Sequence, residues 1–315
     1  MKYIAQVYTG GYAGGGNKNV SAEFIREKLE ALTASLPVSA VIMGWLPDER
    51  LYVQTREYLM KKHIELYLWF PVFAEVNAAY QKNEIMDIRC RGAFQNPDPA
   101  AFQPGESFDF NCPGDERALD IALALYDRYF ANAGFDGVFL DKIRYPTVSG
   151  CDCGCNAERK RAKVITEAVA KACRHFRARG LKIGLDVFAP FLSGYVGQDL
   201  KELTALCDFI KPMMYRRAYA PAGLPYEMLA LSERGSFRDC LTVEFITKDL
   251  SRLVNGENRC PVYAGVEVNS VPGVVAADPA YVKESVAAFE NAGAEGAVLS
   301  WNILEAPDAN WQILI

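Results

Sequence analysis

Three carboxylates in this 315-residue chain stand at or near the end of short apolar runs, namely Asp141, Asp186 and Glu267. Short apolar runs bounded by turn residues are typical of buried parallel strands. A carboxylate at such a place is costly to bury unless the protein uses it, and parallel α/β folds bind ligands at the carboxyl ends of their strands. We therefore expect the three residues at an active site. For Asp141 the alternative is a structural ion pair with Lys142 or Arg144.

Two carboxylates on either side of a pocket are the minimal set for glycoside hydrolysis. One is ionised and acts as nucleophile or base, and the other is a general acid whose pKa is raised by burial or by a neighbouring negative charge. Gly184 and Gly265 lie two residues before Asp186 and Glu267. Because side chains on one face of a strand recur every second residue, both glycines leave room for the acid to point inward.

Aromatic and polar residues gather at the same expected strand ends, where they would bind substrate. These residues are Tyr8, Trp45, Trp69, Arg144, Tyr145, Lys211, Tyr215, Asn269 and Trp301. Aromatic rings suit the apolar faces of sugar rings, and packing between loops is the alternative role for each of them.

Other chemistries are disfavoured by what the chain lacks. Of its two histidines, His63 precedes an expected strand and His175 lies within an expected helix. This excludes most histidine-based metal hydrolases and Ser-His-Asp triads, and no Gly-x-Ser-x-Gly elbow or P-loop occurs. A Schiff base at Lys211 or Lys142 has no support from a glycine-rich phosphate site. We expect catalysis to require no cofactor.

Eight apolar runs alternate with helical patterns along the chain. They cover residues 3–8, 38–46, 64–73, 138–143, 182–188, 209–215, 262–268 and 297–303. This alternation predicts a (β/α)8 barrel, an α/β fold, as one domain over residues 1–315. Residues 74–114 form a long excursion that we expect to act as a lid at the catalytic face. An open doubly wound sheet is the weaker alternative, because no Gly-x-Gly-x-x-Gly turn follows a strand.

The charge and hydropathy of the chain exclude some classes of binding partner. The net charge is −5. The sequence contains no basic stripe with interleaved aromatic residues, so we do not expect it to bind nucleic acid. No apolar run approaches 18 residues, so no membrane span is expected. The first residues are too polar for a signal peptide, which predicts a cytoplasmic protein, or a secreted one if a leader was removed. The sequence gives no signal for an oligomeric state.

A cysteine cluster follows the fourth run, at Cys151, Cys153 and Cys155. Together with Cys112 or Cys90 these thiols could bind a structural zinc ion. Their spacing differs from the usual Cys-x-x-Cys, so free thiols or a disulfide are the alternative. The remaining cysteines are expected to be small buried apolar residues, at positions 173, 207, 240 and 260.

Three segments resemble a known group of proteins, the uncharacterised glycoside-hydrolase barrels that are distantly similar to α-amylases. The segments are Phe135-Asp136-Gly137-x-x-x-Asp141-x-x-Arg144-Tyr145-Pro146, Leu185–Phe188 and Lys211–Tyr215. The resemblance covers roughly residues 108–216 and implies a carbohydrate-active TIM barrel. It implies Asp141 as the nucleophile and leaves the acid open between Asp186 and Glu267. Phe139 stands where the amylases have an arginine.

The leading hypothesis is therefore a glycosidase that cleaves an oligo- or polysaccharide. A carbohydrate-binding barrel without catalysis is one alternative. Another polysaccharide-active barrel enzyme, a lyase or a deacetylase, is the other.

Overall fold

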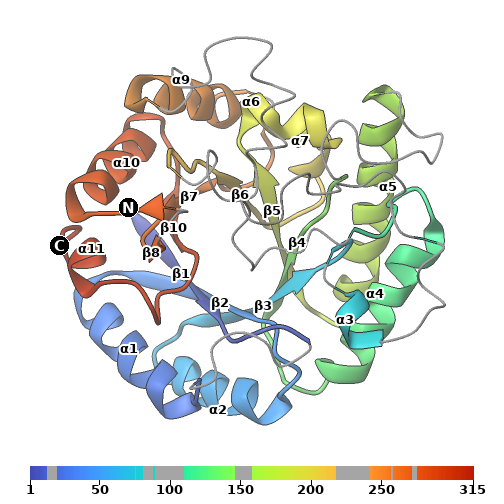
Figure 1. Cartoon of the computed structure of the whole chain (residues 1–315), viewed down its shortest axis with the longest axis horizontal. Coiled ribbons are helices and arrows are strands. Elements are labelled where there is room, and N and C mark those ends of the chain that lie inside the picture. Colours follow the sequence, from blue (N-terminus) through green and yellow to red (C-terminus); the bar gives the residue numbers. More distant parts are fainter. Residues whose placement is uncertain are drawn as a thin grey trace, which may run out of the picture.

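The computed structural model describes residues 1–12, 20–74, 76–80, 88, 110–145, 158–217, 242–256, 258–271 and 275–315. Eight parallel strands of this part close into a barrel in the order β1-β10-β7-β6-β5-β4-β3-β2 (Figure 1). The strands are β1 (Lys2–Tyr8), β2 (Val38–Gly44), β3 (Glu65–Pro71), β4 (Gly137–Asp141), β5 (Lys182–Phe188), β6 (Phe209–Met213), β7 (Tyr263–Glu267) and β10 (Gly296–Ser300). Two short strands, β8 (Ser270–Val271) and β9 (Val275–Ala276), pair antiparallel beside it. The predicted (β/α)8 barrel is confirmed.

Helices surround the barrel on all sides (Figure 1). They are α1 (Ala22–Ser35), α2 (Glu49–Met60), α3 (Asn77–Tyr80), α4 (Glu116–Tyr129), α5 (Glu158–Arg177), α6 (Pro190–Ser193), the 3-10 turn η2 (Gly194–Val196), α7 (Leu200–Leu203), α9 (Val243–Val254), α10 (Pro279–Asn291) and α11 (Asp308–Gln312). No helix among the described residues is long and apolar enough to cross a membrane.

The helix starts follow from capping residues in the sequence. Ser21 accepts a hydrogen bond from the Phe24 amide at the start of α1, and Asp278 accepts one from the Tyr281 amide at the start of α10. Each cap satisfies a backbone donor that has no partner inside the helix. Pro279 occupies the first helical position of α10, where a missing N–H costs nothing. The residue types at these positions therefore explain where α1 and α10 begin.

The connection from β5 to β6 contains less helix than its sequence pattern predicts. The pattern over residues 197–206 predicts one helix, but α7 has only the four residues Leu200–Leu203. Gly197 is left-handed with a φ of 80°, and Asp199 caps the turn that begins after it. The segment therefore crosses back as α6, η2 and α7 in place of one full helix.

The strand register brings two of the predicted catalytic residues to neighbouring positions. Leu140 on β4 pairs with Leu185 on β5, so the next residues along both strands are Asp141 and Asp186. A side chain on Gly184 would collide with the Phe139 ring, so these two paired residues share a face. Lys211 on β6 binds Asp186 and also lies 3.5 Å from Gln6 Oε1 on β1, a strand that is not adjacent to β6, so Asp186 points into the barrel. The alternation predicted from the sequence is therefore confirmed on these two strands.

Both ends of the 74–114 excursion are held against the barrel. Ala74 and Phe110 form an antiparallel bridge, and the Asn111 amide donates to the carbonyl of Phe73. Most of the excursion lies outside the described residues, so its predicted role as a lid stays a prediction.

Candidate active site

Asp141 ends β4 with its carboxylate held by two N–H donors. The Trp69 indole Nε1 donates to its Oδ2 at 2.8 Å, and the Lys142 backbone N donates to its Oδ1 at 2.5 Å. The side chain is 8% exposed. Within the described part of the chain Asp141 makes no ion pair, so the structural ion pair with Lys142 or Arg144 is not formed there. The two N–H donors orient the carboxylate group of Asp141, whose oxygens accept both hydrogen bonds.

Arg144 and Tyr145 turn into the packed interior beside this strand end. The Arg144 guanidinium lies 4.7 Å from the ring centres of both Phe110 and Phe188. Tyr145 is fully buried beneath the guanidinium of Arg161. These contacts support the loop after β4, and the predicted contact of both residues with substrate stays a prediction.

Asp186 on β5 belongs to a buried polar cluster that is centred on the Lys211 ammonium. The Lys211 ammonium lies 3.1 Å from Asp186 Oδ2, 2.6 Å from the Tyr215 hydroxyl and 3.5 Å from Gln6 Oε1. Asp186 is 4% exposed and Lys211 is fully buried. Asp186 Oδ1 has no hydrogen-bond partner among the described residues. Oδ2 of Asp186 is thus bound by a cation, whereas Oδ1 remains available for a further hydrogen bond.

The protonation of Asp186 follows from this setting. Burial raises the pKa of Asp186 to about 7, because a charge is poorly solvated inside the barrel. The Lys211 ammonium lowers this pKa, and the negative charge of Asp141 raises it. Asp186 is therefore protonated below about pH 7 and ionised above it.

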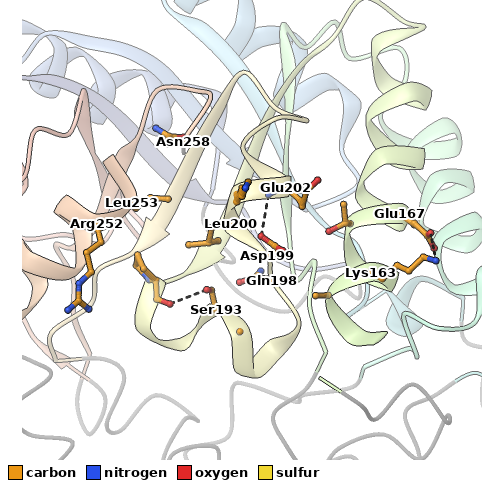
Figure 2. Close-up of a pocket in the computed structure, with 15 residues that line it drawn as sticks. Lys163, Glu167, Ser193, Gln198, Asp199, Leu200, Glu202, Arg252, Leu253 and Asn258 are labelled. Carbon is orange, nitrogen blue, oxygen red and sulfur yellow. Dashed lines mark hydrogen bonds and ion pairs between the residues drawn. The ribbon is translucent and has the colours of Figure 1, made fainter. Parts of the chain in front are cut away.

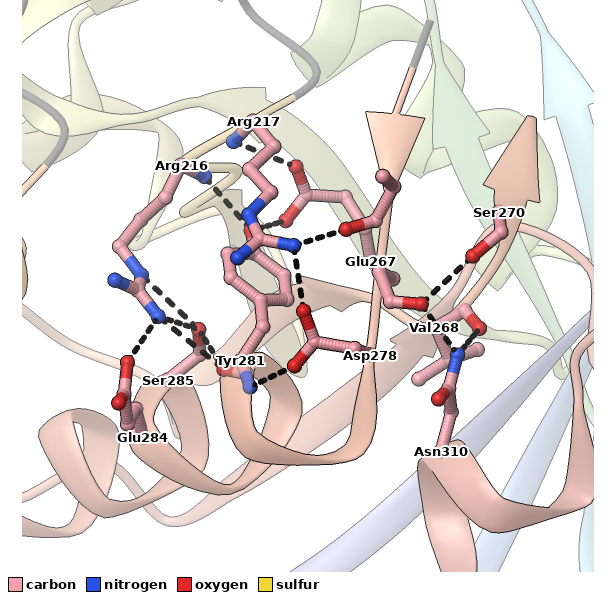
Figure 3. A network of polar contacts seen from close by, with 12 residues as sticks. Arg216, Arg217, Glu267, Val268, Ser270, Asp278, Tyr281, Glu284, Ser285 and Asn310 are labelled. Carbon is pink, nitrogen blue, oxygen red and sulfur yellow. Dashed lines mark hydrogen bonds and ion pairs between the residues drawn. The ribbon is translucent and has the colours of Figure 1, made fainter. Parts of the chain in front are cut away.

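Glu267 ends β7 in a different environment (Figure 3). Its Oε1 accepts from the Arg217 backbone N at 3.1 Å, and its Oε2 accepts from the Tyr281 hydroxyl. The side chain is fully buried. The Arg217 guanidinium lies over the Tyr281 ring and pairs with Asp278 at 3.0 Å. Glu267 thereby joins β7, the exit of β6 and the start of α10.

Asn269 fixes the turn after β10. Its Oδ1 accepts from the backbone N atoms of Trp301 and Asn302 at 2.8 and 2.9 Å, and its Nδ2 donates to the Asn302 carbonyl. These bonds place the Trp301 ring against Tyr215, with ring centres 5.7 Å apart. The structure gives Asn269 a positioning role, and its predicted contact with substrate stays a prediction.

An aromatic wall stands beside Asp141. Trp45 packs edge-on against Trp69 at 5.2 Å between ring centres, and Tyr8 lies 5.1 Å from Trp45 and 6.1 Å from Trp69. Trp69 also donates the hydrogen bond to Asp141, so the wall and the carboxylate are directly joined. The structure therefore brings these three predicted substrate-binding residues together.

A cavity of about 1090 Å³ lies elsewhere, on the outside of the barrel (Figure 2). It is lined by α5, by the α6–α7 connection and by the end of α9. The short helices of that connection do not fill the space that one full helix occupies in a regular barrel. None of the predicted site residues lines this cavity, so the strand ends remain the candidate site.

The predicted zinc ligands Cys151, Cys153 and Cys155 lie outside the described residues. Cys112, a proposed fourth ligand, is buried. Residues that the structure does describe contain no group of three or more His, Cys, Asp or Glu side chains suited to a metal ion. The structural zinc site stays a prediction, as does catalysis without a cofactor.

Sequence reasoning missed Tyr281 and Arg217, the two partners of Glu267. Tyr281 lies 14 residues further along the chain and Arg217 lies 50 residues before it. Tyr281 is the third residue after the helix cap Asp278, a position that the pattern of an amphipathic helix assigns only to packing. No local signal in the sequence marks either residue.

Comparison with known sequences identifies a family. Residues 77–302 match the profile of a family described as "putative glycosyl hydrolase domain". No curated protein matches the sequence.

Solved structures with the same fold include several glycoside hydrolases. The glycoside hydrolase domain of PgaB (BpsB) from Bordetella bronchiseptica superposes with a TM-score of 0.67 at 12% identity, covering 99% of this chain and 98% of that one. A class V chitinase from Pseudomonas fluorescens gives 0.58 at 15% identity, with 99% and 98% covered. The glycoside hydrolase domain of PelA from Pseudomonas aeruginosa gives 0.55 at 12% identity, with 96% of both chains covered. At these identities the likeness establishes the shared barrel fold.

Proposed function

The chain belongs to this family of glycosyl hydrolase domains, and we propose that it hydrolyses an oligo- or polysaccharide with Asp141 and Asp186 as its catalytic pair. The observation that carries the proposal is their placement one residue beyond the paired Leu140 and Leu185, on adjacent strands and on the inward face. Two carboxylates so placed are the minimal apparatus for breaking a glycosidic bond.

The two residues take different roles because their surroundings differ. Asp141 is held by two N–H donors and acts as the nucleophile or base. Asp186 is buried beside it, and its pKa of about 7 leaves about half of its population protonated at pH 7. A carboxylic acid of this kind donates its proton to the leaving oxygen of the scissile bond.

Glu267 is the less suitable acid. Both of its oxygens already accept hydrogen bonds, from Arg217 and Tyr281, and its side chain is fully buried. A proton donor must reach the glycosidic oxygen within hydrogen-bond distance. Glu267 would have to break contacts that join two strands and a helix before it could do so.

The neighbours of the pair supply positioning and binding. Lys211 holds one oxygen of Asp186 and thereby fixes which oxygen faces the substrate. Tyr8, Trp45 and Trp69 offer rings beside Asp141 that suit the apolar faces of sugars. Trp301, packed against Tyr215, offers a further ring on the β10 side of the barrel.

Chitin oligosaccharides are the first substrates to test, because a chitinase is among the proteins that share the fold across nearly the whole chain. Maltooligosaccharides form the comparison set, since the motif of β4 resembles that of α-amylase-like barrels. The assay incubates the purified protein with each set and identifies the products by mass spectrometry. Two fragments whose masses sum to the substrate plus one water are the expected result.

Three other outcomes would contradict hydrolysis and name its replacement. Binding of an oligosaccharide in calorimetry without any cleavage would indicate a carbohydrate-binding barrel. Fragments that sum to the mass of the substrate alone, with a new double bond, would indicate a lyase. Released acetate with an intact sugar chain would indicate a deacetylase.

A further inference from the structure

Cys207 and Cys260 face each other at the end of the barrel opposite the candidate active site. Cys207 lies two residues before β6, and Cys260 lies three residues before β7. Their Sγ atoms are 3.5 Å apart, although the residues are separated by 53 positions in the sequence. Each cysteine is buried, with 8% of its surface exposed.

The backbone around the two thiols is fixed by strand pairing. The Ile210 amide donates to the Pro261 carbonyl at 3.0 Å, and Ile210 bridges to Val262 in parallel. Adjacent strands lie about 4.8 Å apart, which falls within the range of Cα separations that a disulfide spans, about 4.4–6.8 Å. The two sulfur atoms are 3.5 Å apart and must approach by about 1.5 Å to reach the length of a disulfide bond, about 2.05 Å.

The two thiols make few other contacts with the described residues. Cys207 Sγ is 3.5 Å from the Leu203 carbonyl, and Cys260 Sγ is 3.8 Å from Asn258 Oδ1. In the described ranges no third side chain joins them to make a metal site. A single buried cysteine packs like a small apolar residue, but two in contact on paired strands form a site for covalent chemistry.

We propose that Cys207 and Cys260 form an intrachain disulfide under oxidising conditions, linking the entry of β6 to the entry of β7. Oxidised glutathione is a sufficient oxidant. The thiolate of one cysteine attacks its disulfide and releases one reduced glutathione, and the second cysteine then displaces the other. One S–S bond forms in the protein, one S–S bond breaks in the oxidant, and the two thiol protons end on two reduced glutathione molecules.

The bond forms most readily while the chain is folding. In the folded protein the Cys260 thiol and burial raise the pKa of Cys207, so its reactive thiolate is scarce. During folding both thiols are accessible before the strands pair. The strand pairing then favours this partner over the other cysteines.

The experiment refolds the whole chain in a buffer of oxidised and reduced glutathione, alkylates the remaining thiols and digests the protein with trypsin. The expected product is peptide 202–216 linked to peptide 260–283. The linked protein should melt about 4–8 °C higher than the reduced protein, because the bond restricts the unfolded chain.

Variants assign the cross-link. Cys207→Ser should remove both the linked peptide and the rise in melting temperature. Cys173→Ser is the matched control, since Cys173 is also a buried cysteine, located on α5, and this variant should retain both. Alkylation of Cys207 and Cys260 in the refolded wild-type protein, or a linkage of Cys207 to Cys173, would overturn the proposal even if the variants failed to fold.

Discussion

Two regions at the mouth of the barrel look alike in the sequence and differ in the structure. We call them the β4–β5 corner, with Asp141 and Asp186, and the β7–α10 corner, with Glu267. At the β4–β5 corner, Asp141 and Asp186 occupy adjacent strand ends, and one oxygen of Asp186 has no hydrogen-bond partner among the described residues. At the β7–α10 corner, Glu267 also ends a strand, but Arg217 and Tyr281 occupy both of its oxygens. At the first corner a carboxylate oxygen remains available for a further hydrogen bond. At the second corner both carboxylate oxygens are used in bonds that connect β7, the segment after β6 and α10.

The difference shows that a carboxylate at a strand end is necessary for this chemistry but does not define a role. Desolvation acts on all three residues, since each is 8% exposed or less. What separates them is the neighbouring group: N–H donors for Asp141, an ammonium for Asp186, and a tyrosine hydroxyl with a backbone amide for Glu267. The predictions below test this contrast.

Asp141→Asn should have the largest effect. Loss of a catalytic carboxylate is expected to lower kcat by about 10⁴-fold or more, while asparagine preserves the shape of the side chain and the fold. Rates are measured on the oligosaccharide that the wild-type protein cleaves. Asp136→Asn, the same change before the start of β4, is the matched control, because Asp136 binds Arg56 and the Leu66 amide away from the mouth. Near-normal turnover by Asp141→Asn would remove the β4–β5 corner from the mechanism.

Asp186→Asn should follow, with a loss of about 10²–10⁴-fold as for other general acids. Because the pKa of Asp186 is raised to about 7 by burial, the acid is protonated below that pH and loses its proton above it. The wild-type kcat/KM should therefore fall about tenfold per pH unit on the alkaline side.

This alkaline limb distinguishes the two corners. It should disappear in Asp186→Asn and persist in Glu267→Gln, in pH–rate profiles recorded on the same substrate. If the limb instead vanished with Glu267→Gln, the roles assigned to the corners would be reversed.

Lys211→Met should move the limb without abolishing activity. The ammonium of Lys211 lowers the pKa of Asp186, so its removal raises that pKa further. The limb should shift to higher pH by about 1–3 units, the usual effect of one close opposite charge. Lys211→Arg retains the charge and serves as the control. An unchanged limb in Lys211→Met would show that the titrating group is not Asp186.

Tyr281→Phe should have the smallest effect on catalysis and a clear effect on stability. It removes one of the donors that Glu267 requires in a fully buried setting, which is expected to lower the free energy of unfolding by about 1–3 kcal/mol. Denaturant unfolding measures the loss. Tyr58→Phe is the control, because the Tyr58 hydroxyl is buried without a hydrogen-bond partner in the described part of the chain. If Tyr281→Phe lowered kcat by more than its loss in free energy of unfolding accounts for, Glu267 would take part in the reaction itself.

Local patterns in the sequence were sufficient for the barrel and for part of the site. The alternation of apolar runs and helices predicts the closed sheet, and alternation within strands places Asp141 and Asp186 on the inward face. The family match confirms the predicted class of enzyme, a glycosidase. These features depend on residues near one another in the chain.

The partners of the site residues could not be predicted because they come from distant parts of the chain. Trp69 donates to Asp141 across 72 residues, and Arg217 donates to Glu267 across 50. The contact between Cys207 and Cys260 likewise depends on the parallel pairing of two strands. Such contacts are set by the register of the closed sheet, which no local pattern specifies.

The hydrogen bond from the Trp69 indole to Asp141 gives the protein an internal optical probe. Indole emission responds to the charge and the solvent near its ring nitrogen. Protonation of this carboxylate, its conversion to an ester or its coverage by a ligand would each alter the fluorescence of one of only four tryptophans. Events at the candidate nucleophile can therefore be followed in real time, without a label and before the natural substrate is known.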